Sequence, residues 1–195
     1  MSTNIEIEVK VLLEKDDFTK VLEMMETEKS KRFTQTNHYI DTDDFALRRY
    51  GMALRIRETE DFILTLKTPL AEGLLEKNQS ISWKEYEAFL ARGVFPEGPI
   101  AHFVESLGIQ VDRLRILTSL TTVRTVIHYR DGILSLDENT YDDAHDFELE
   151  MEANSIGDAT NLLQEVCEHC QVPFVLNTRS KQARAMDIYH RRKQA

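Results

Sequence analysis

The sequence predicts an α+β protein built on about eight strands, most of them joined as antiparallel neighbours, with helices between and after them. Several segments alternate apolar and charged side chains, beginning with Ile5–Lys10, and this alternation is typical of strands with one buried face. Other segments carry apolar residues at helical spacing. The charged strand faces either point to water, as in a sandwich, or point inward in a closed sheet that helices cover. Composition alone slightly favours charged faces that point to water.

The first half of the chain is predicted to alternate strands with one helix. Within the first strand, residues 4–13, Glu6, Glu8 and Lys10 share the charged face. An amphipathic helix follows, with Asp16 or Asp17 as its N-cap. Turn residues and Pro69 then delimit four further strands, which we expect at residues 31–41, 52–58, 62–68 and 74–81.

The second half begins with a predicted helical insert over residues 82–107. Ser82 and Glu85 form a capping-box pattern, and Gly93 ends the first of its two helices. Three strands are expected after the insert, with Asp131-Gly132 as a two-residue hairpin turn. Their predicted ranges are residues 115–130, 132–138 and 146–153, and helices follow from residue 157 or 158 to 169 and over 180–191. No long linker interrupts the chain, which predicts a single domain over residues 1–195.

The charge balance restricts the partners that this chain can bind. It has 34 acidic and 24 basic residues and a formal net charge of −10. Such an acidic chain is not expected to carry a broad nucleic-acid surface, because phosphate backbones require a basic footprint. A small anion still fits if cations gather in one place or a metal assists. No apolar run is long enough for a membrane span or a signal peptide, so we expect a cytoplasmic protein. The oligomeric state is left open.

A series of short motifs resembles the CYTH family, the triphosphate tunnel metalloenzymes, over nearly the whole chain. Glu6-Ile7-Glu8-Val9-Lys10 is similar to the family's Glu-x-Glu-x-Lys on the first strand. The motifs that follow in the family's order are Tyr39-Ile40-Asp41-Thr42, Leu54-Arg55-Ile56-Arg57, Leu64-Thr65-Leu66-Lys67-Thr68-Pro69, Arg124, Leu136-Asp137, Glu148-Leu149-Glu150 and Ser180-Lys181. The insert at residues 82–107 resembles the version in Firmicute members.

The resemblance implies a closed eight-stranded antiparallel β-barrel with flanking α-helices. Its charged interior would form a tunnel that binds a linear triphosphate with Mg²⁺ or Mn²⁺. Family activities include inorganic triphosphatase, thiamine triphosphatase, RNA triphosphatase and adenylyl cyclase. We expect a metal-dependent hydrolase of inorganic tripolyphosphate. The alternatives are another family activity, a non-catalytic sensor that binds polyphosphate or nucleotide, and a structural β-protein with solvated charge.

On this resemblance, the basic residues bind the phosphates. Arginine meets phosphate oxygens with a planar, permanently charged fork, whereas lysine supplies a movable point charge. The predicted substrate-binding residues are Arg55, Arg57, Lys67, Arg124, Lys181 and Arg184. The predicted catalytic residues are Lys10, Lys67 and Tyr39, because members that cleave thiamine triphosphate are proposed to use a Tyr and a Lys at matching positions on the leaving group. Lys10 or Lys67 would also assist a metal-activated water.

The acidic residues of the same motifs are the predicted metal ligands. Carboxylates are the hard oxygen ligands that Mg²⁺ prefers, and several of them inside a tunnel would repel one another without a cation. The predicted ligands are Glu6, Glu8, Asp137, Glu148 and Glu150. Glu152 continues the face of Glu150, so the choice of pair among the three late glutamates stays open. Cys167 and Cys170 have metal or redox spacing, but they also fit the end of an amphipathic helix, which is the favoured interpretation.

Overall fold

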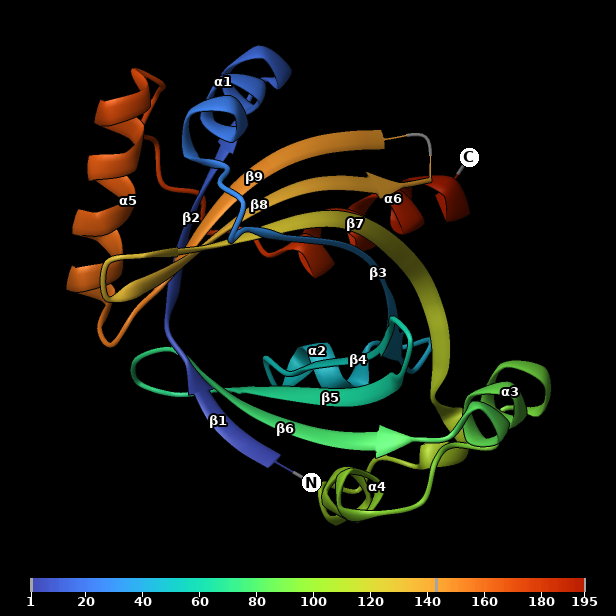
Figure 1. Cartoon of the computed structure of the whole chain (residues 1–195). Coiled ribbons are helices and arrows are strands. Elements are labelled where there is room, and N and C mark those ends of the chain that lie inside the picture. The colour runs from blue at the N-terminus through green and yellow to red at the C-terminus, as the bar shows by residue number, and fades with distance from the viewer. Residues whose placement is uncertain (1, 143, 195) are drawn as a thin grey trace. The chain divides into compact units, whose positions relative to one another are not determined.

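The computed structural model describes residues 2–142 and 144–194 and divides into two compact units. Unit 1 comprises Met1–Ile5, Thr36–Leu120 and Lys181–Ala195, and unit 2 comprises Glu6–Gln35 and Thr121–Ser180. Two long strands, β3 (Lys31–Asp41) and β7 (Arg115–Tyr129), contribute a segment to each unit (Figure 1). Each unit is therefore assembled from segments that are far apart in the sequence.

Antiparallel strands form the framework of both units. In unit 1, the order is β1 (Ser2–Glu6), β6 (Leu74–Ile81), β5 (Phe62–Pro69), β4 (Ala53–Glu58), β3 and β7. In unit 2, the order is β3, β7, β8 (Gly132–Tyr141), β9 (Ala144–Glu152) and β2 (Glu8–Leu13). The described chain thus has nine strands, and its strand order ends at β1 and at β2 without a closing pair. The prediction of a closed eight-stranded barrel is wrong in strand number and in closure.

The extra strand arises near the N-terminus, where one strand was expected over residues 4–13. The structure divides this segment at Ile7 into β1 and β2, because its two halves pair with different neighbours. β1 lies beside β6, whereas β2 pairs with β9 from Glu8 to Leu13. The Ile7 carbonyl accepts a hydrogen bond of 3.1 Å from Ala153 N at the change of partner. A continuous alternation of side chains does not reveal such a change.

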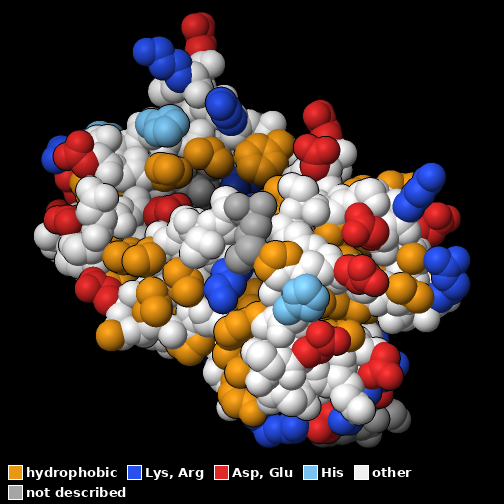
Figure 2. Space-filling model, turned by 90° about the horizontal axis from the view of Figure 1, so that it is seen from below, with side chains coloured by type: hydrophobic (Ala, Val, Ile, Leu, Met, Phe, Trp, Pro, Cys, Tyr) orange, Lys and Arg blue, Asp and Glu red, His pale blue; other side chains and the backbone are white. Residues whose placement is uncertain are grey.

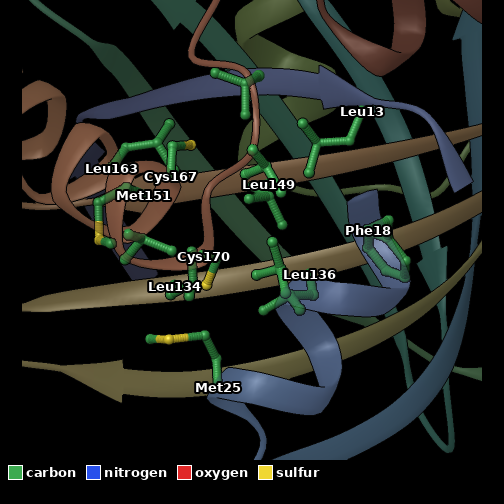
Figure 3. Close-up of a cluster of buried hydrophobic side chains, with 14 of the residues drawn as sticks. Leu13, Phe18, Met25, Leu134, Leu136, Leu149, Met151, Leu163, Cys167 and Cys170 are labelled. Carbon is green, nitrogen blue, oxygen red and sulfur yellow. The ribbon is translucent and has the colours of Figure 1, made fainter. Parts of the chain in front are cut away.

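The core of unit 2 lies between one face of its strands and two helices. α5 (Ile156–Cys170) contacts β2, β8 and β9, and α1 (Lys15–Met25) contacts β9 and α5. Figure 3 shows Phe18 and Met25 of α1, Leu163 of α5 and Leu149 of β9 in one cluster. Cys167 and Cys170 are buried in the same cluster and form no disulfide. Burial raises the pKa of the Cys167 thiol to about 11, so it packs as a neutral side chain.

The core of unit 1 lies on the apolar face of β3 to β6, beside the helical insert. The insert contains α3 (Trp83–Arg92) and α4 (Pro99–Ser106), followed by a 3-10 turn (Val111–Arg113). Leu54, Ile56, Leu64 and Leu66 of the strands are completely buried in this core, where they pack with insert residues such as Ile100 and Val104. A short helix, α2 (Ala46–Arg49), precedes β4, and α6 (Lys181–Gln194) ends the chain.

The helix starts and turns test the predictions that rested on local sequence signals. Ser82 and Glu85 form both hydrogen bonds of the predicted capping box, and Gly93 ends α3 with φ 70°, so this prediction is confirmed. The N-cap of α1 is Glu14, and that of α5 is Ser155, one to three residues before the predicted positions. The tight turn after β7 consists of Arg130 and Asp131, because Gly132 already pairs with Tyr129. The predicted Asp131-Gly132 turn is therefore displaced by one residue.

Charged side chains are mixed on the molecular surface that Figure 2 shows. Lys and Arg side chains are scattered among Asp and Glu on this face, with hydrophobic patches between them (Figure 2). The exposed hydrophobic side chains of the described chain include Trp83, Leu90 and Val94 in or next to α3. No helix among residues 2–142 and 144–194 is long and apolar enough to cross a membrane.

Candidate functional site

The polar face of unit 2 carries most of the predicted acidic residues. The strand register places Arg124 of β7, Asp137 of β8 and Glu148 of β9 side by side. The next row on the same face contains Glu150 of β9, opposite Lys10 of β2. The intervening residues of these strands, such as Leu136 and Leu149, belong to the apolar core. Strict alternation of side chains therefore gives these strands one apolar face and one charged face.

Three carboxylates on this face form a compact group that suits a metal ion. Oxygen atoms of Asp137, Glu148 and Glu150 lie within 4.8 Å of one another, and all three side chains are buried. Asp137 and Glu148 have no exposed surface at all. Glu6 and Glu8 are outside this group of three in the described chain. The structure thus brings together three of the five predicted ligands.

Two basic side chains hold this carboxylate group in place. Arg124 donates from Nε to Asp137 Oδ1 at 2.7 Å and from one terminal nitrogen to Asp137 Oδ2 and Glu150 Oε2, both at 2.5 Å. Lys10 donates to Glu150 Oε1 at 2.9 Å and contacts Glu8. Burial opposes the charged form of Arg124, but Asp137 and Glu150 outweigh it and raise its pKa well above the usual value.

The type and spacing of these carboxylate oxygens suit a divalent cation. Hard carboxylate oxygens are the donors that Mg²⁺ and Mn²⁺ prefer, and a cation among clustered carboxylates offsets their mutual repulsion. The donor set and its spacing therefore fit a divalent metal.

The polar face of unit 1 carries the predicted basic residues. Tyr39 of β3 lies opposite Arg55 of β4, and Arg55 lies opposite Thr65 of β5. Arg57 lies beside Arg55 on the same face, and Lys67 of β5 lies opposite Glu76 of β6. This face thus combines three cations with the buried Tyr39 side chain, and guanidinium and ammonium groups are donors that phosphate oxygens accept.

Glu76 is a site residue that the sequence interpretation missed. One of its oxygens lies 3.0 Å from Lys67 Nζ and 3.6 Å from a terminal nitrogen of Arg55. Burial raises the pKa of this carboxyl, but Lys67 and Arg55 outweigh it and lower the pKa to about 2. Glu76 is therefore ionised and holds both cations. The signal that could have identified Glu76 is its place in the β5–β6 hairpin, whose register pairs Lys67 with Glu76.

The Nε atom of Arg55 is a second sign that this face receives an anion. This atom is buried and has no hydrogen-bond partner in the described part of the chain. Buried polar groups in native proteins are rarely left unpaired, and such exceptions often mark a place where a ligand or water binds. An unpaired guanidinium donor favours an oxygen-rich anion.

Other residues of the predicted motifs have structural roles or lie elsewhere in unit 1. The buried Asp41 carboxylate accepts backbone hydrogen bonds from Thr42, Leu47 and Arg48 and so fixes the start of α2. His38 lies on the opposite face of β3 from Tyr39, where it contacts Ser119, Glu58 and Tyr86.

The last two predicted substrate-binding residues, Lys181 and Arg184, occupy the first turn of α6. Both are largely buried, with 8% and 9% of their surface exposed. α6 packs in unit 1, where the His190 ring lies 4.6 Å from that of Phe45. Lys181 and Arg184 are therefore buried rather than free on the surface.

Comparisons with known proteins place this arrangement in one family. A model of the CYTH domain matches residues 4–172. A Bacillus subtilis protein, YjbK, which is provisionally named as a triphosphatase, is 34% identical over 174 residues, covering 89% of this chain and 90% of that protein.

Solved structures agree with this assignment. A Bacillus halodurans protein provisionally described as an adenylate cyclase has a TM-score of 0.84 and 37% identity, and the match covers 94% of this chain and 98% of that one. A Hippeastrum protein, HpAC1, described with a dominant triphosphatase activity, shares the fold at a TM-score of 0.79 and 24% identity, over 94% and 96% of the two chains. With its family-model match and its matching motifs, the chain belongs to the CYTH domain family.

Proposed function

We propose that this protein is a divalent-metal-dependent triphosphatase. The observation that carries the proposal is the buried group of Asp137, Glu148 and Glu150 in unit 2, which has the donor atoms and the spacing for a metal. The basic face of unit 1 supports an anionic substrate. The proposal is also consistent with the name of YjbK and with the activity described for HpAC1. Inorganic tripolyphosphate is the substrate that we favour.

The basic residues would bind and orient the phosphate chain. Hydrolysis of a phosphoanhydride requires mainly positioning and charge stabilisation rather than covalent chemistry by the protein. We assign this role to Arg55, Arg57, Lys67, Lys181 and Arg184 in unit 1 and to Arg124 in unit 2. Because Arg124 already holds Asp137 and Glu150, it would act first as an orienting residue for these carboxylates.

The carboxylates would hold the metal. Asp137, Glu148 and Glu150 are the primary ligands in this proposal, and Glu6 and Glu8 are the further predicted ligands. Mg²⁺ or Mn²⁺ bound there would polarise phosphate oxygens and lower the pKa of a bound water. Lys10 would keep the Glu150 carboxylate in place through its 2.9 Å contact.

Three residues are candidates for the chemical step. Lys67 and Lys10 are the lysines to which we assign stabilisation of the negative charge that develops on the leaving group. The Tyr39 hydroxyl is a candidate proton donor for the leaving group, since Tyr39 lies on the same face as Arg55. If Lys67→Ala retained full turnover of tripolyphosphate with Mg²⁺, the role of Lys67 would be wrong.

Two alternative functions would use the same contacts. The name of the Bacillus halodurans structure points to a nucleotide cyclase, which would use the same metal and phosphate contacts. A non-catalytic polyphosphate sensor would use the same basic face without turnover. We also propose that the two units act as one domain, because the family model spans segments of both.

Phosphate release from tripolyphosphate, thiamine triphosphate and ATP tests the proposal directly. We expect metal-dependent release, fastest with tripolyphosphate, in the presence of Mg²⁺ or Mn²⁺ and none with EDTA. Glu148→Gln should abolish this release, because it removes one of three clustered carboxylates. The matched control is Asp131→Asn, which removes an exposed carboxylate from the β7–β8 turn of the same unit and should retain turnover.

The outcomes separate the alternatives. Formation of cyclic AMP from ATP would favour the cyclase. If no substrate is cleaved but tripolyphosphate still raises the melting temperature, the sensor is favoured and the hydrolase is contradicted. Equal turnover in Glu148→Gln and Asp131→Asn would show that the carboxylate group of Asp137, Glu148 and Glu150 is not part of the active site.

A further inference from the structure

Asn37 presents a buried hydrogen-bond acceptor on the same face of unit 1 as Arg55 and Arg57. Its side chain is 1% exposed, and the register places it directly opposite Arg57. The Asn37 Oδ1 atom has no hydrogen-bond partner among the described residues. Tyr39, the next residue on this face of β3, lies opposite Arg55. Asn37 is therefore a diagonal neighbour of Arg55, whose Nε is also unpaired.

The buried atoms without a hydrogen bond on this face differ in character. The Nε atoms of Arg55 and Arg57 are donors and suit phosphate oxygens, whereas Asn37 Oδ1 and Glu76 Oε1 are acceptors, and Glu76 Oε1 already lies 3.0 Å from Lys67 Nζ. Fully ionised phosphate groups have only acceptor oxygens, so a phosphate cannot satisfy Asn37. An unmet acceptor that is so deeply buried requires a donor to be stable. If Arg55 and Arg57 bind phosphate oxygens, the group that reaches Asn37 carries an O–H or N–H bond.

We propose that Asn37 is a binding residue that accepts a hydrogen bond from a donor group beside the phosphate on Arg55. This inference rests on the proposed function and narrows its substrate class. The donor has two possible sources with the same chemistry. One is a water molecule held against the phosphate chain, which would serve any triphosphate. The other is a hydroxyl or amino group of an organic triphosphate, which inorganic tripolyphosphate lacks.

Asn37→Leu tests this role because leucine has a similar shape and no acceptor oxygen. The ligand-free variant should be at least as stable as the wild type, since Asn37 Oδ1 loses no hydrogen bond. The matched control is Asn139→Leu. Asn139 is also completely buried, but it accepts from Thr122 at 2.7 Å and donates to Asp146 at 2.9 Å. The control should therefore lose stability without any ligand, unlike Asn37→Leu.

Ligand binding then identifies the donor. Dissociation constants are measured by calorimetry in alkaline buffer, where the phosphate oxygens are ionised, for tripolyphosphate, thiamine triphosphate and ATP. Loss of one hydrogen bond should weaken binding by roughly tenfold. A loss for all three ligands supports the inference with water as the donor. A loss confined to the organic triphosphates supports it with an organic donor and makes these the substrate class.

Two further results would overturn the inference. If the wild type binds triphosphates and Asn37→Leu binds all of them equally well, Asn37 takes no part in binding, while the proposed function stands. If ligand-free Asn37→Leu is destabilised as much as Asn139→Leu, Asn37 has a structural partner. If Asn37→Leu does not fold, Asn37→Ala is measured in the same way. A wild type that binds no triphosphate contradicts the proposed function, and the inference falls with it.

Discussion

Glu76 illustrates how a single buried carboxylate prepares the basic face of unit 1. It lies within ion-pair distance of Lys67 and Arg55. Without an anion in place, three neighbouring cations would repel one another, and Glu76 offsets part of that repulsion. A bound phosphate would compete with Glu76 for the same cations. The carboxylate therefore stabilises the fold while it limits how tightly an anion binds.

Glu76→Gln should change the acid stability of the protein. The pKa of Glu76 is lowered to about 2 in the folded state, from a reference value of 4.5. A lowered folded-state pKa stabilises the protein above the unfolded-state pKa, and this contribution is lost as the pH falls toward the folded-state pKa. The wild type should therefore lose about 3 kcal/mol relative to the variant between the two pKa values. Urea unfolding over this acid range measures the difference.

The control for this measurement is Glu87→Gln, which removes an exposed carboxylate from α3. It should follow the wild-type acid curve. If Glu76→Gln also followed the wild-type curve, Glu76 would not be held by Lys67 and Arg55 in the folded protein. An increase in the affinity of Glu76→Gln for tripolyphosphate would independently support competition between Glu76 and the phosphate.

Residue identities predicted the chemical types at the site but not their pairing. Arg124 was expected to bind substrate, whereas the structure shows it holding Asp137 and Glu150. These contacts depend on the register of β7, β8 and β9, which aligns residues 124, 137 and 148. Register is set by long-range strand pairing, and motif order along the chain does not contain it.

Among the elements, the β7–β8 hairpin requires a glycine at position 132, because neighbouring atoms leave no room there for a side chain. A Cβ on Gly132 would lie 2.9 Å from Met151 Sδ and 3.0 Å from both Glu152 O and Leu162 Cδ1. Because one of these atoms is backbone, β9 cannot yield by a rotamer change alone. Gly132 therefore permits β8, β9 and α5 to approach closely.

Gly132→Ala should lower the free energy of unfolding by about 1–3 kcal/mol, because it overpacks this contact. Chemical denaturation of the two proteins measures the loss. Gly157→Ala is the matched control, since its Cβ would meet only Ser155 Oγ at an ordinary 3.7 Å. That change in α5 should be neutral or stabilising by up to about 1 kcal/mol. Equal effects of both substitutions would show that the atoms around Gly132 move away from the new methyl group without loss of stability.

Elements with strong local signals could be predicted from the sequence, and those with long-range causes could not. β3 and β6 have the predicted bounds, and the capping box of α3 forms as expected. The break at Ile7 was missed because both halves of the segment keep the same alternation while they pair with different strands. The same break accounts for the ninth strand.

At the scale of the whole molecule, the clustered carboxylates and most of the predicted phosphate-binding cations lie in different units. Unit 2 gathers the buried carboxylates Asp137, Glu148 and Glu150, and unit 1 gathers Arg55, Arg57 and Lys67. Family motifs predicted both sets, because each motif lies on a strand whose polar face is fixed by alternation. The assembly of each unit from distant segments was not predictable, because it depends on which strands pair. The net charge of −10 conceals this sorting.

The sorting of charge predicts that metal and phosphate protect different parts of the molecule from amide hydrogen exchange. Mg²⁺ alone should slow exchange in β8 and β9 of unit 2, because it would bind the folded carboxylate group and not the unfolded chain. Tripolyphosphate with EDTA should instead slow exchange in β4 and β5 of unit 1, which carry its cations. At a concentration about 100 times its dissociation constant, either ligand should add about 2.7 kcal/mol to the free energy of unfolding of the unit that binds it.

Glu148→Gln should abolish the protection by Mg²⁺ and leave the protection by tripolyphosphate intact. Asp131→Asn is the control, which should keep both. Protection of β4 and β5 by Mg²⁺ alone, or persistent Mg²⁺ protection in Glu148→Gln, would contradict the assignment of the metal to unit 2.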